Sequence, residues 1–461
     1  MKKTALVLCA LLAGGYVAGA QNDGGISDRM LESFRKSYTP SSSDKAVRNA
    51  LNVTSIAVLA ENADNAAMMD THFSDRVTTK GITDQKRSGR CWLFTGLNVL
   101  RAQAMSEHNL GETEFSQSFC FFYDQLEKSN LFLQAIIDTR SLPLDDRKVQ
   151  WLMQNPLSDG GTFTGVANLV MKYGIVPSEV MPESLVANNT SAYASQMRQL
   201  LRQDALALRT AKNTKTALKM KEEMLSEVYR LLCLCFGEPP VEFEWTCYDA
   251  QDNKVSTKKY TPKSFYAEFC GNDLNHGYVM LMNDPSREYY KVYEIEYDRH
   301  LYDGDNWLYL NLPIDDIKQM AIASIKAGRA MYFSCDVNKF LNRDKGTLDL
   351  ANYDYESLLG VEYTMDKKQR IQTFTSGSSH AMTLIAVDLN EAGSPKKWMV
   401  ENSWGASMGY KGNLIMTDEW FNEYMFRLVV ESRFVPDNLL KLLEQKPVQL
   451  PAWDPMFLME Q

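Results

Sequence analysis

The stretch QKRSGRCWLFTGLNVLR, residues 85–101, decides how the rest of this chain is interpreted. Cys91 follows a Ser88-Gly89 turn and opens a run that is apolar on nearly every side, which predicts a buried helix starting at the cysteine. A helix N-terminus carries partial positive charge and lowers the pKa of a thiol placed there, and the thiolate is the nucleophilic form. The stretch therefore predicts a reactive cysteine.

A reactive thiol also needs a base, and two later stretches supply one together with a group that orients it. His380 begins an apolar strand in SHAM (residues 379–382), and Asn402 follows 22 residues later in VENSWG (residues 400–405). We expect no part in catalysis for the chain's other histidines, which lie in more polar stretches: His72, His108, His276 and His300. No cysteine or histidine pair has the spacing of a zinc site, so we expect no metal.

Composition sets limits on the partners of this chain. It has 461 residues, 45% of them hydrophobic, and its 58 acidic against 49 basic residues give a net charge of -9. This acidity disfavours binding to nucleic acid, which needs a basic surface. The length allows two or three domains or one large elaborated domain.

The first twenty residues have the pattern of a secretory signal peptide. Lys2 and Lys3 precede an apolar run at residues 5–17, and a small-residue cleavage pattern occupies residues 18–20. We therefore expect a protein exported to the periplasm or secreted, and soluble, because no other stretch reaches membrane-spanning length. Seven of the eight cysteines remain after cleavage. An odd count in a secreted chain indicates a free thiol, and we expect the other six to be buried thiols without a structural disulfide.

These motifs resemble the papain-like cysteine peptidases, and more narrowly the bleomycin hydrolase and aminopeptidase C family. The resemblance runs from about residue 70 to the C-terminus and rests on an ordered series of motifs: SGRCWLF at 88–94, FSQSF at 115–119, DGG at 159–161, SSHAMT at 378–383, VENSWG at 400–405, MTDEWFNEY at 416–424 and LPAWDPM at 450–456. It implies an α+β, two-lobed papain-like fold, with helices around Cys91, an antiparallel sheet carrying His380, and the site between them. It also implies a thiol peptidase that needs no cofactor and acts on peptides.

Thiol acyl transfer requires a nucleophile, a base, an orienting group and oxyanion donors. We assign Cys91 as the nucleophile and His380 as the base and acid. Asn402 is expected to orient His380, with Trp404 shielding their hydrogen bond, and Gln85 to donate to the oxyanion. We also expect the pair to rest as thiolate and imidazolium.

Gly160 and Gly161 let backbone approach a ligand closely. The residues alone favour an ordinary turn before the next helix. In the family that this chain resembles, the corresponding loop pairs with substrate backbone, so the resemblance favours Gly160 and Gly161 as substrate-binding residues.

The spacing of the motifs indicates a large insertion. His380 follows Cys91 by 289 residues, whereas a simple papain-type enzyme separates these residues by roughly 130–150. We predict six segments: a signal peptide at 1–20, an exposed arm at 21–50, a helical lobe at 51–190, a mainly helical insertion at 191–300, a β lobe at 301–435 and a C-terminal arm at 436–461. Residues 191–236 are predicted to form one or two long helices projecting from the core. By resemblance, such an insertion mediates assembly into a hexamer whose active sites face an internal cavity.

Several elements are predicted from hydrophobic periodicity. Helices are expected at 112–127, 131–152 and 313–327, and strands at 330–337, 381–387, 397–401, 413–416 and 427–432. The aromatic-rich residues 264–312 are expected to contribute strands that pack on the core.

The C-terminal arm bears on the mode of cleavage. In the resembled family the last residues lie in the cleft, and the terminal carboxylate holds the free amine of the substrate, which makes an aminopeptidase. Here Gln461 would carry that carboxylate, with Glu460 as a substitute anchor, but Phe457, Leu458 and Met459 are bulkier than usual. A tail that lies elsewhere would leave an endopeptidase, and a non-enzymatic peptide-binding cage is a further alternative.

Overall fold

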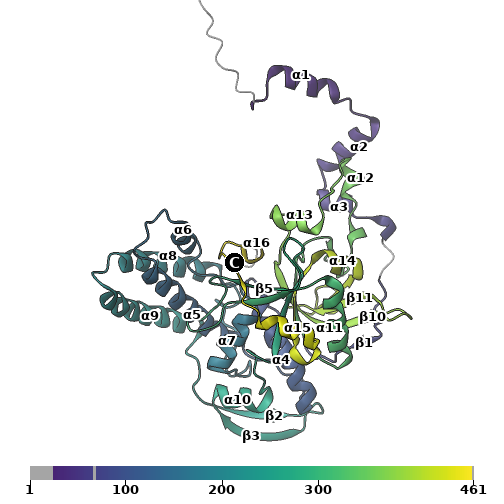
Figure 1. The fold of residues 1–461 in the computed structure, drawn as a ribbon. Coiled ribbons are helices and arrows are strands. Elements are labelled where there is room, and N and C mark those ends of the chain that lie inside the picture. Colours follow the sequence, from purple (N-terminus) through teal and green to yellow (C-terminus); the bar gives the residue numbers. More distant parts are fainter. Residues whose placement is uncertain (1–23, 66–68, 459–461) are drawn as a thin grey trace, which may run out of the picture.

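The computed structural model describes residues 24–65 and 69–458 and places them in two lobes with separate hydrophobic cores (Figure 1). One lobe is built mainly of helices, and the other is built on a large mixed sheet. This arrangement confirms the predicted α+β class. The predicted signal peptide lies outside the described residues.

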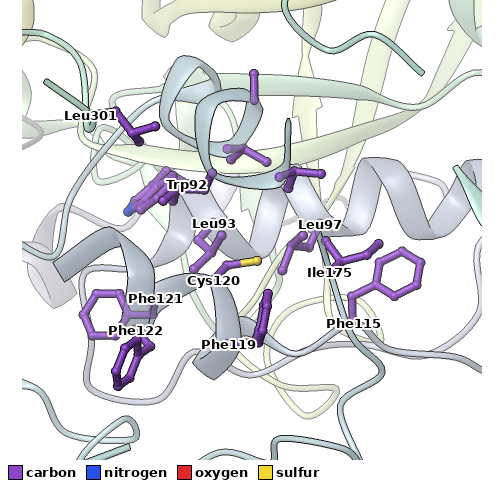
Figure 2. Close-up of a cluster of buried hydrophobic side chains, with 14 of the residues drawn as sticks. Trp92, Leu93, Leu97, Phe115, Phe119, Cys120, Phe121, Phe122, Ile175 and Leu301 are labelled. Carbon is purple, nitrogen blue, oxygen red and sulfur yellow. The ribbon is translucent and has the colours of Figure 1, made fainter. Parts of the chain in front are cut away.

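The helical lobe is centred on α4, which begins at Cys91 and is buried along most of its length. Its helices are α4 (Cys91–His108), α5 (Gln117–Asp138), α6 (Arg147–Gln154), α7 (Phe163–Tyr173), α8 (Ser191–Arg209) and α9 (Thr214–Phe236). Figure 2 shows the core that α4 and α5 share, with Trp92 and Leu301 on one side and the rings of Phe121 and Phe122 on another. A sequence that is apolar on nearly every side thus forms a helix that is enclosed from Trp92 to Met105.

The boundaries of α5 differ from the prediction. Ser116 caps the helix by accepting a hydrogen bond from the Phe119 N–H, so α5 starts at Gln117 rather than at residue 112. It then continues to Asp138, which takes in the start of the second predicted helix. A turn separates it from α6, whose N-cap is Asp146.

The helices of the predicted insertion do not project from the core. Both α8 and α9 pack against α5, and Leu201, Leu208, Val228 and Leu232 are buried at these contacts. The lobe is extended by a hairpin of β2 (Phe243–Tyr248) and β3 (Lys254–Tyr260), which is followed by α10 (Pro262–Phe269). An amphipathic pattern could not distinguish packing on a lobe from projection away from it.

The second lobe is built on a twelve-stranded sheet with the order β14-β5-β6-β4-β13-β7-β10-β11-β12-β9-β8, and β1 pairs with β10. Its strands are β1 (Asp75–Arg76), β4 (Tyr278–Met282), β5 (Lys291–Ile295), β6 (Leu308–Asn311), β7 (Met331–Cys335), β8 (Leu341–Asn342), β9 (Thr347–Leu348), β10 (His380–Leu389), β11 (Pro395–Glu401), β12 (Asn413–Thr417), β13 (Met425–Glu431) and β14 (Val448–Leu450). Most neighbours are antiparallel, but β4–β6, β9–β12 and β5–β14 are parallel. Both β4 and β5 belong to this sheet, although they lie within residues 191–300, the range of the predicted insertion.

Helices from the second half of the chain pack around the sheet (Figure 1). They are α11 (Ile314–Lys326), α13 (Lys367–Gln372), α14 (Asp418–Tyr424) and α15 (Asp437–Leu440), whereas α12 (Tyr355–Leu359) lies against α3 (Ile56–Ala60). The apolar face of α11 packs on β10 and β13, as its amphipathic pattern predicted. The strand β10 is buried over nearly its whole length and lies at the centre of the lobe.

The two ends of the described chain behave differently. At the N-terminal end, α1 (Asp28–Ser37) and α2 (Ser42–Leu51) bury no side chain, and they lead into α3 (Ile56–Ala60) beside α12. They extend away from both lobes in Figure 1. At the C-terminal end, β14 joins the sheet edge and α16 (Pro455–Leu458) lies between the lobes (Figure 1).

Two chemical features of the described ranges bear on the sequence expectations. All seven cysteines that they contain are free thiols, but Cys233 and Cys235 are half-buried and not buried as expected. No helix among residues 24–65 and 69–458 is both long and apolar enough to cross a membrane.

Candidate active site

The site begins at the N-terminus of α4, where the half-buried Cys91 is the first helical residue. The residue before it, Arg90, is fully buried and forms a two-pronged ion pair with Glu183, with nitrogen–oxygen distances of 3.0 and 2.7 Å. Its guanidinium also donates to the Ala187 carbonyl at 2.7 Å. A planar guanidinium paired in this way holds its backbone rigidly, so Arg90 fixes the point at which α4 and its cysteine begin.

His380 approaches the thiol from the other lobe. The helix α4 packs on β10, and the backbone N–H of Ala381, the residue after His380, lies close enough to the Cys91 thiol to lower its pKa. His380 Nε2 lies 2.8 Å from Asn402 Oδ1, and the imidazole stacks on the Trp404 indole with ring centroids 4.8 Å apart. The histidine is therefore held on one edge and one face, beside the thiol.

Gln85 is fixed to the loop that carries Asn402. Its backbone N–H donates to the Ser403 carbonyl at 2.9 Å, and its side-chain Oε1 accepts from the Ser403 hydroxyl at 2.7 Å. Its Nε2 donates to the Ser88 carbonyl at 2.7 Å. An amide NH₂ has two donors, so one N–H of this group remains for a ligand.

Burial controls the charge of the two reactive groups. Burial raises the pKa of the Cys91 thiol to about 11, although the N–H groups of Ala381, Trp92 and Cys91 itself oppose this. Burial also lowers the pKa of His380 to about 4, against the effect of its bond to Asn402. Both shifts favour the neutral groups, which is opposite to the thiolate–imidazolium pair expected from the sequence. A Cys91 thiolate and a His380 imidazolium can therefore form here only through their attraction to each other.

The glycine loop lies beside a cavity of about 300 Å³ whose lining includes Gly160, Gly161, Asp298, His300 and Phe457. The Gly160 carbonyl is turned inward and accepts from Lys128 Nζ at 2.6 Å. By contrast, no described residue forms a hydrogen bond with the N–H or carbonyl of Gly161. Cys91 and His380 do not line this cavity, so it adjoins the reactive pair and does not contain it.

The C-terminal arm is docked as far as the described chain extends. Met456 is fully buried in a small separate core with Trp307, Tyr309 and Phe426. Asp454 forms an ion pair with Arg287, and Arg427 donates to the Met456 carbonyl at 2.5 Å. Phe457 then lines the cavity beside the glycine loop.

The structure therefore brings together five of the residues singled out in the sequence. They are Gln85, Cys91, His380, Asn402 and Trp404, with Gly160 and Gly161 close by. Glu460 and Gln461 lie outside the described residues. Within the described ranges no group of histidine, cysteine and acidic residues is arranged to hold a metal.

Sequence reasoning missed one group beside the site. His300 lies in a polar stretch of the sequence, yet its side chain is 2% exposed, with its Nδ1 2.5 Å from the Asp124 carboxylate and its ring against Trp92. Because 176 residues separate His300 from Asp124, no local signal in the sequence pairs them.

Comparison with known proteins places this geometry in a family. A model of the Peptidase C1-like family matches residues 25–457. Bleomycin hydrolase of Homo sapiens is 41% identical over 389 residues, which cover 82% of this chain and 86% of the human protein. Aminopeptidase C of Lactococcus lactis subsp. cremoris is 38% identical over 415 residues, which cover 89% of this chain and 94% of that protein.

A solved structure agrees with these sequence matches. The crystal structure of PepW from Lactobacillus rhamnosis HN001 superposes with a TM-score of 0.90 at 34% identity, covering 94% of this chain and 99% of that one. The resemblance and the papain-like fold predicted from the motifs are thus confirmed. The chain belongs to the Peptidase C1-like family, as a cysteine-type peptidase related to bleomycin hydrolase and aminopeptidase C.

Proposed function

We propose that this protein is a thiol aminopeptidase that releases N-terminal residues from short peptides. The observation that carries the proposal is the meeting of Cys91, at the start of α4, with His380, at the start of β10, which is hydrogen-bonded to Asn402 after the end of β11. The docked arm, which brings Phe457 beside the glycine loop, supports action at a chain end. Relatives named aminopeptidase C and aminopeptidase G support the same mode.

The proposed reaction is acyl transfer through Cys91. The sulfur attacks the carbonyl carbon of the first peptide bond while His380 Nδ1 takes the thiol proton. The oxyanion receives hydrogen bonds from the Cys91 N–H and from the free N–H of Gln85. His380 then gives the proton to the leaving amine as the C–N bond breaks. Water attacks the thioester, with His380 as base, and the thiol is restored.

The surrounding residues support these roles. The bond between His380 Nε2 and Asn402 Oδ1 leaves Nδ1 free of a proton in the neutral imidazole, which a base requires. Trp404 covers one face of the imidazole and shields that bond from water. Gly161 offers an N–H and a carbonyl to the backbone of the substrate.

Assembly and location are part of the proposal. We infer a homohexamer, because relatives of this kind assemble through the region corresponding to the insertion. We also infer export after cleavage of residues 1–20, because Lys2 and Lys3, the apolar run and the small residues at 18–20 form a signal-peptide pattern. Light scattering of the mature protein and N-terminal sequencing of the secreted form test these two points.

Two variants test the chemistry and its direction. Cys91→Ala should abolish turnover, and retained activity would contradict the assignment of the nucleophile. Deletion of residues 457–461 should open the cleft, so an aminopeptidase gains internal cleavage of long peptides. If the intact protein already cuts internally and the deletion changes little, the tail does not anchor the substrate amine and the protein is an endopeptidase.

A further inference from the structure

Three consecutive carbonyl groups before Gly161 point toward the protein interior. The Ser158 carbonyl accepts from Gln125 Nε2 at 3.0 Å and from Lys128 Nζ at 3.1 Å. The Asp159 carbonyl accepts from the Trp92 indole N–H at 2.8 Å, and the Gly160 carbonyl accepts from Lys128 Nζ at 2.6 Å. The donors come from α4 and α5, so the helices that carry the thiol and its neighbours also set the direction of the loop.

Lys128 is the residue that holds two of these carbonyls, and its charge is balanced on α5. Its Nζ lies 3.0 Å from the Asp124 carboxylate, which is fully buried. Burial raises the pKa of Asp124, but Lys128 and His300 lower it more, so it stays below its usual value. A buried ammonium needs such a partner, because an unpaired charge away from water is costly.

His300 brings the second lobe into the same cluster. It follows β5 in the sheet lobe and contacts Asp124 of the helical lobe. Its ring lies edge-on to Trp92 with centroids 4.6 Å apart. It also packs against the glycine loop so closely that a side chain at Gly161 would come within 2.4 Å of its Cε1. Its neighbour Leu301 lies near Trp92 in the core shown in Figure 2.

These contacts act on a single segment. Residues 158–160 have their carbonyls bound inside the protein, whereas the next residue, Gly161, has both backbone groups free of any described partner. An extended peptide needs one N–H and one carbonyl from a fixed backbone to pair with it, as in a sheet edge. Reversing the loop would offer the Gly160 carbonyl instead and would shift the substrate by one residue.

We propose that Lys128, Asp124 and His300 form a positioning unit, here called the loop clamp, which turns residues 158–160 inward and presents Gly161 to the peptide backbone of the substrate. The inference rests on the proposed function, which it deepens by naming the residues that set the substrate register. None of the three touches the reacting atoms, so they are positioning residues.

The test measures peptide binding without turnover. In the full mature chain carrying Cys91→Ala, the affinity for an unmodified decapeptide is measured by calorimetry, with and without Lys128→Met. Losing two charge-assisted hydrogen bonds to the loop should weaken binding at least about 10-fold. The matched control is Lys172→Met, which removes a lysine paired with Glu127 and Asp303 but bonded to no loop carbonyl. The control should change the affinity less than about twofold.

A kinetic measurement separates positioning from loss of folded protein. With the active cysteine, Lys128→Met should raise KM for the decapeptide while kcat changes less. A merely destabilised protein would instead show a lower apparent kcat at unchanged KM, and that result would overturn the clamp. If Lys128→Met does not fold, the double variant Asp124→Asn/Lys128→Met, which leaves neither charge of that pair, should show the same loss of affinity.

The outcomes distinguish this inference from the proposed function. If the wild-type protein cleaves no peptide but its affinity for the decapeptide still depends on Lys128, the result would support the clamp and contradict the aminopeptidase. Normal cleavage by a Lys128→Met enzyme with unchanged affinity and KM would contradict the clamp and leave the aminopeptidase standing.

Discussion

His380 Nε2 and Asn402 Oδ1 lie 2.8 Å apart, and the same Oδ1 accepts a hydrogen bond from the Ser403 N–H. Because Oδ1 is an acceptor only, the imidazole must donate from Nε2. The lone pair on Nδ1 is then available to the thiol of Cys91. A single amide thus selects the tautomer in which His380 can act as a base.

Removal of this amide should slow the chemical step. Asn402→Ala frees the imidazole to rotate and to change tautomer, so kcat should fall by about 10–100-fold while KM changes little. Steady-state kinetics with a fluorogenic amino-acid amide measures both constants. The control is Asn390→Ala, on the exposed loop between β10 and β11, which should leave kcat within about twofold. Equal losses from both substitutions would contradict the role of Asn402.

The pKa of His380 sets the acid limit of activity. Burial lowers the pKa of this imidazole to about 4. Protonation occupies Nδ1 and removes the base, so activity should be present above about pH 4 and should be lost as the pH falls through that value. A profile of kcat/KM against pH, corrected for unfolding at each pH, measures this midpoint. A midpoint near the ordinary histidine value of about 6.5 would contradict the effect of burial.

Substitution of Gln85 should lower kcat more than substitution of Ser403, whose hydroxyl holds the Gln85 side chain. Gln85→Ala removes an oxyanion donor and should lower kcat by about 10²–10³-fold. Ser403→Ala removes the hydroxyl that fixes Oε1, but the bond from Gln85 Nε2 to the Ser88 carbonyl remains, so the loss should be smaller. Both variants should leave KM nearly unchanged. A larger loss from Ser403→Ala than from Gln85→Ala would contradict this order.

Asp298 should make stability depend on pH. Its side chain is 2% exposed, one carboxylate oxygen has no hydrogen-bond partner, and burial raises its pKa to about 7 against the influence of Arg427 and Lys128. Between about pH 4 and pH 7 the folded state binds the proton more tightly than the unfolded state, so stability falls as the pH rises through this window.

Asp298→Asn removes this titration and keeps the shape of the side chain. Urea unfolding at pH 5 and at pH 8 measures the difference in the free energy of unfolding between the variant and the wild type. The advantage of the variant should be larger at pH 8 than at pH 5, by about 1–3 kcal/mol. Asp305→Asn, on the same connection but exposed, is the control and should show no such gain. A gain that is equal at both pH values would contradict the titration of Asp298.

The sequence predicted the parts of the site that are encoded locally. Cys91 begins a buried helix and His380 begins a buried strand, because a run that is apolar on nearly every side follows Cys91 and a shorter apolar run follows His380. The order of motifs along the chain then indicated that these elements meet. The start of α5 was misjudged because Ser116, a capping residue, competes with the apolar pattern that begins before it.

Other features depend on contacts between distant residues and could not be predicted. His300 stands in a stretch that looks polar, yet Asp124 and Trp92 enclose it in the folded protein. The helices α8 and α9 have faces that would suit a projecting arm, and only their contact with α5 shows that they belong to the lobe. The neutral state that burial favours for Cys91 also depends on the packing around it, which a helix start alone does not reveal.

The most direct test uses one decapeptide in two forms, free and N-acetylated, incubated with the reduced mature protein from Gln21 onward and followed by mass spectrometry. The account predicts stepwise loss of residues from the free amine, no cleavage of the acetylated form, and no cleavage of either by Cys91→Ala. Internal cuts in both forms would contradict the aminopeptidase, and cleavage by the Cys91→Ala protein would contradict the site itself.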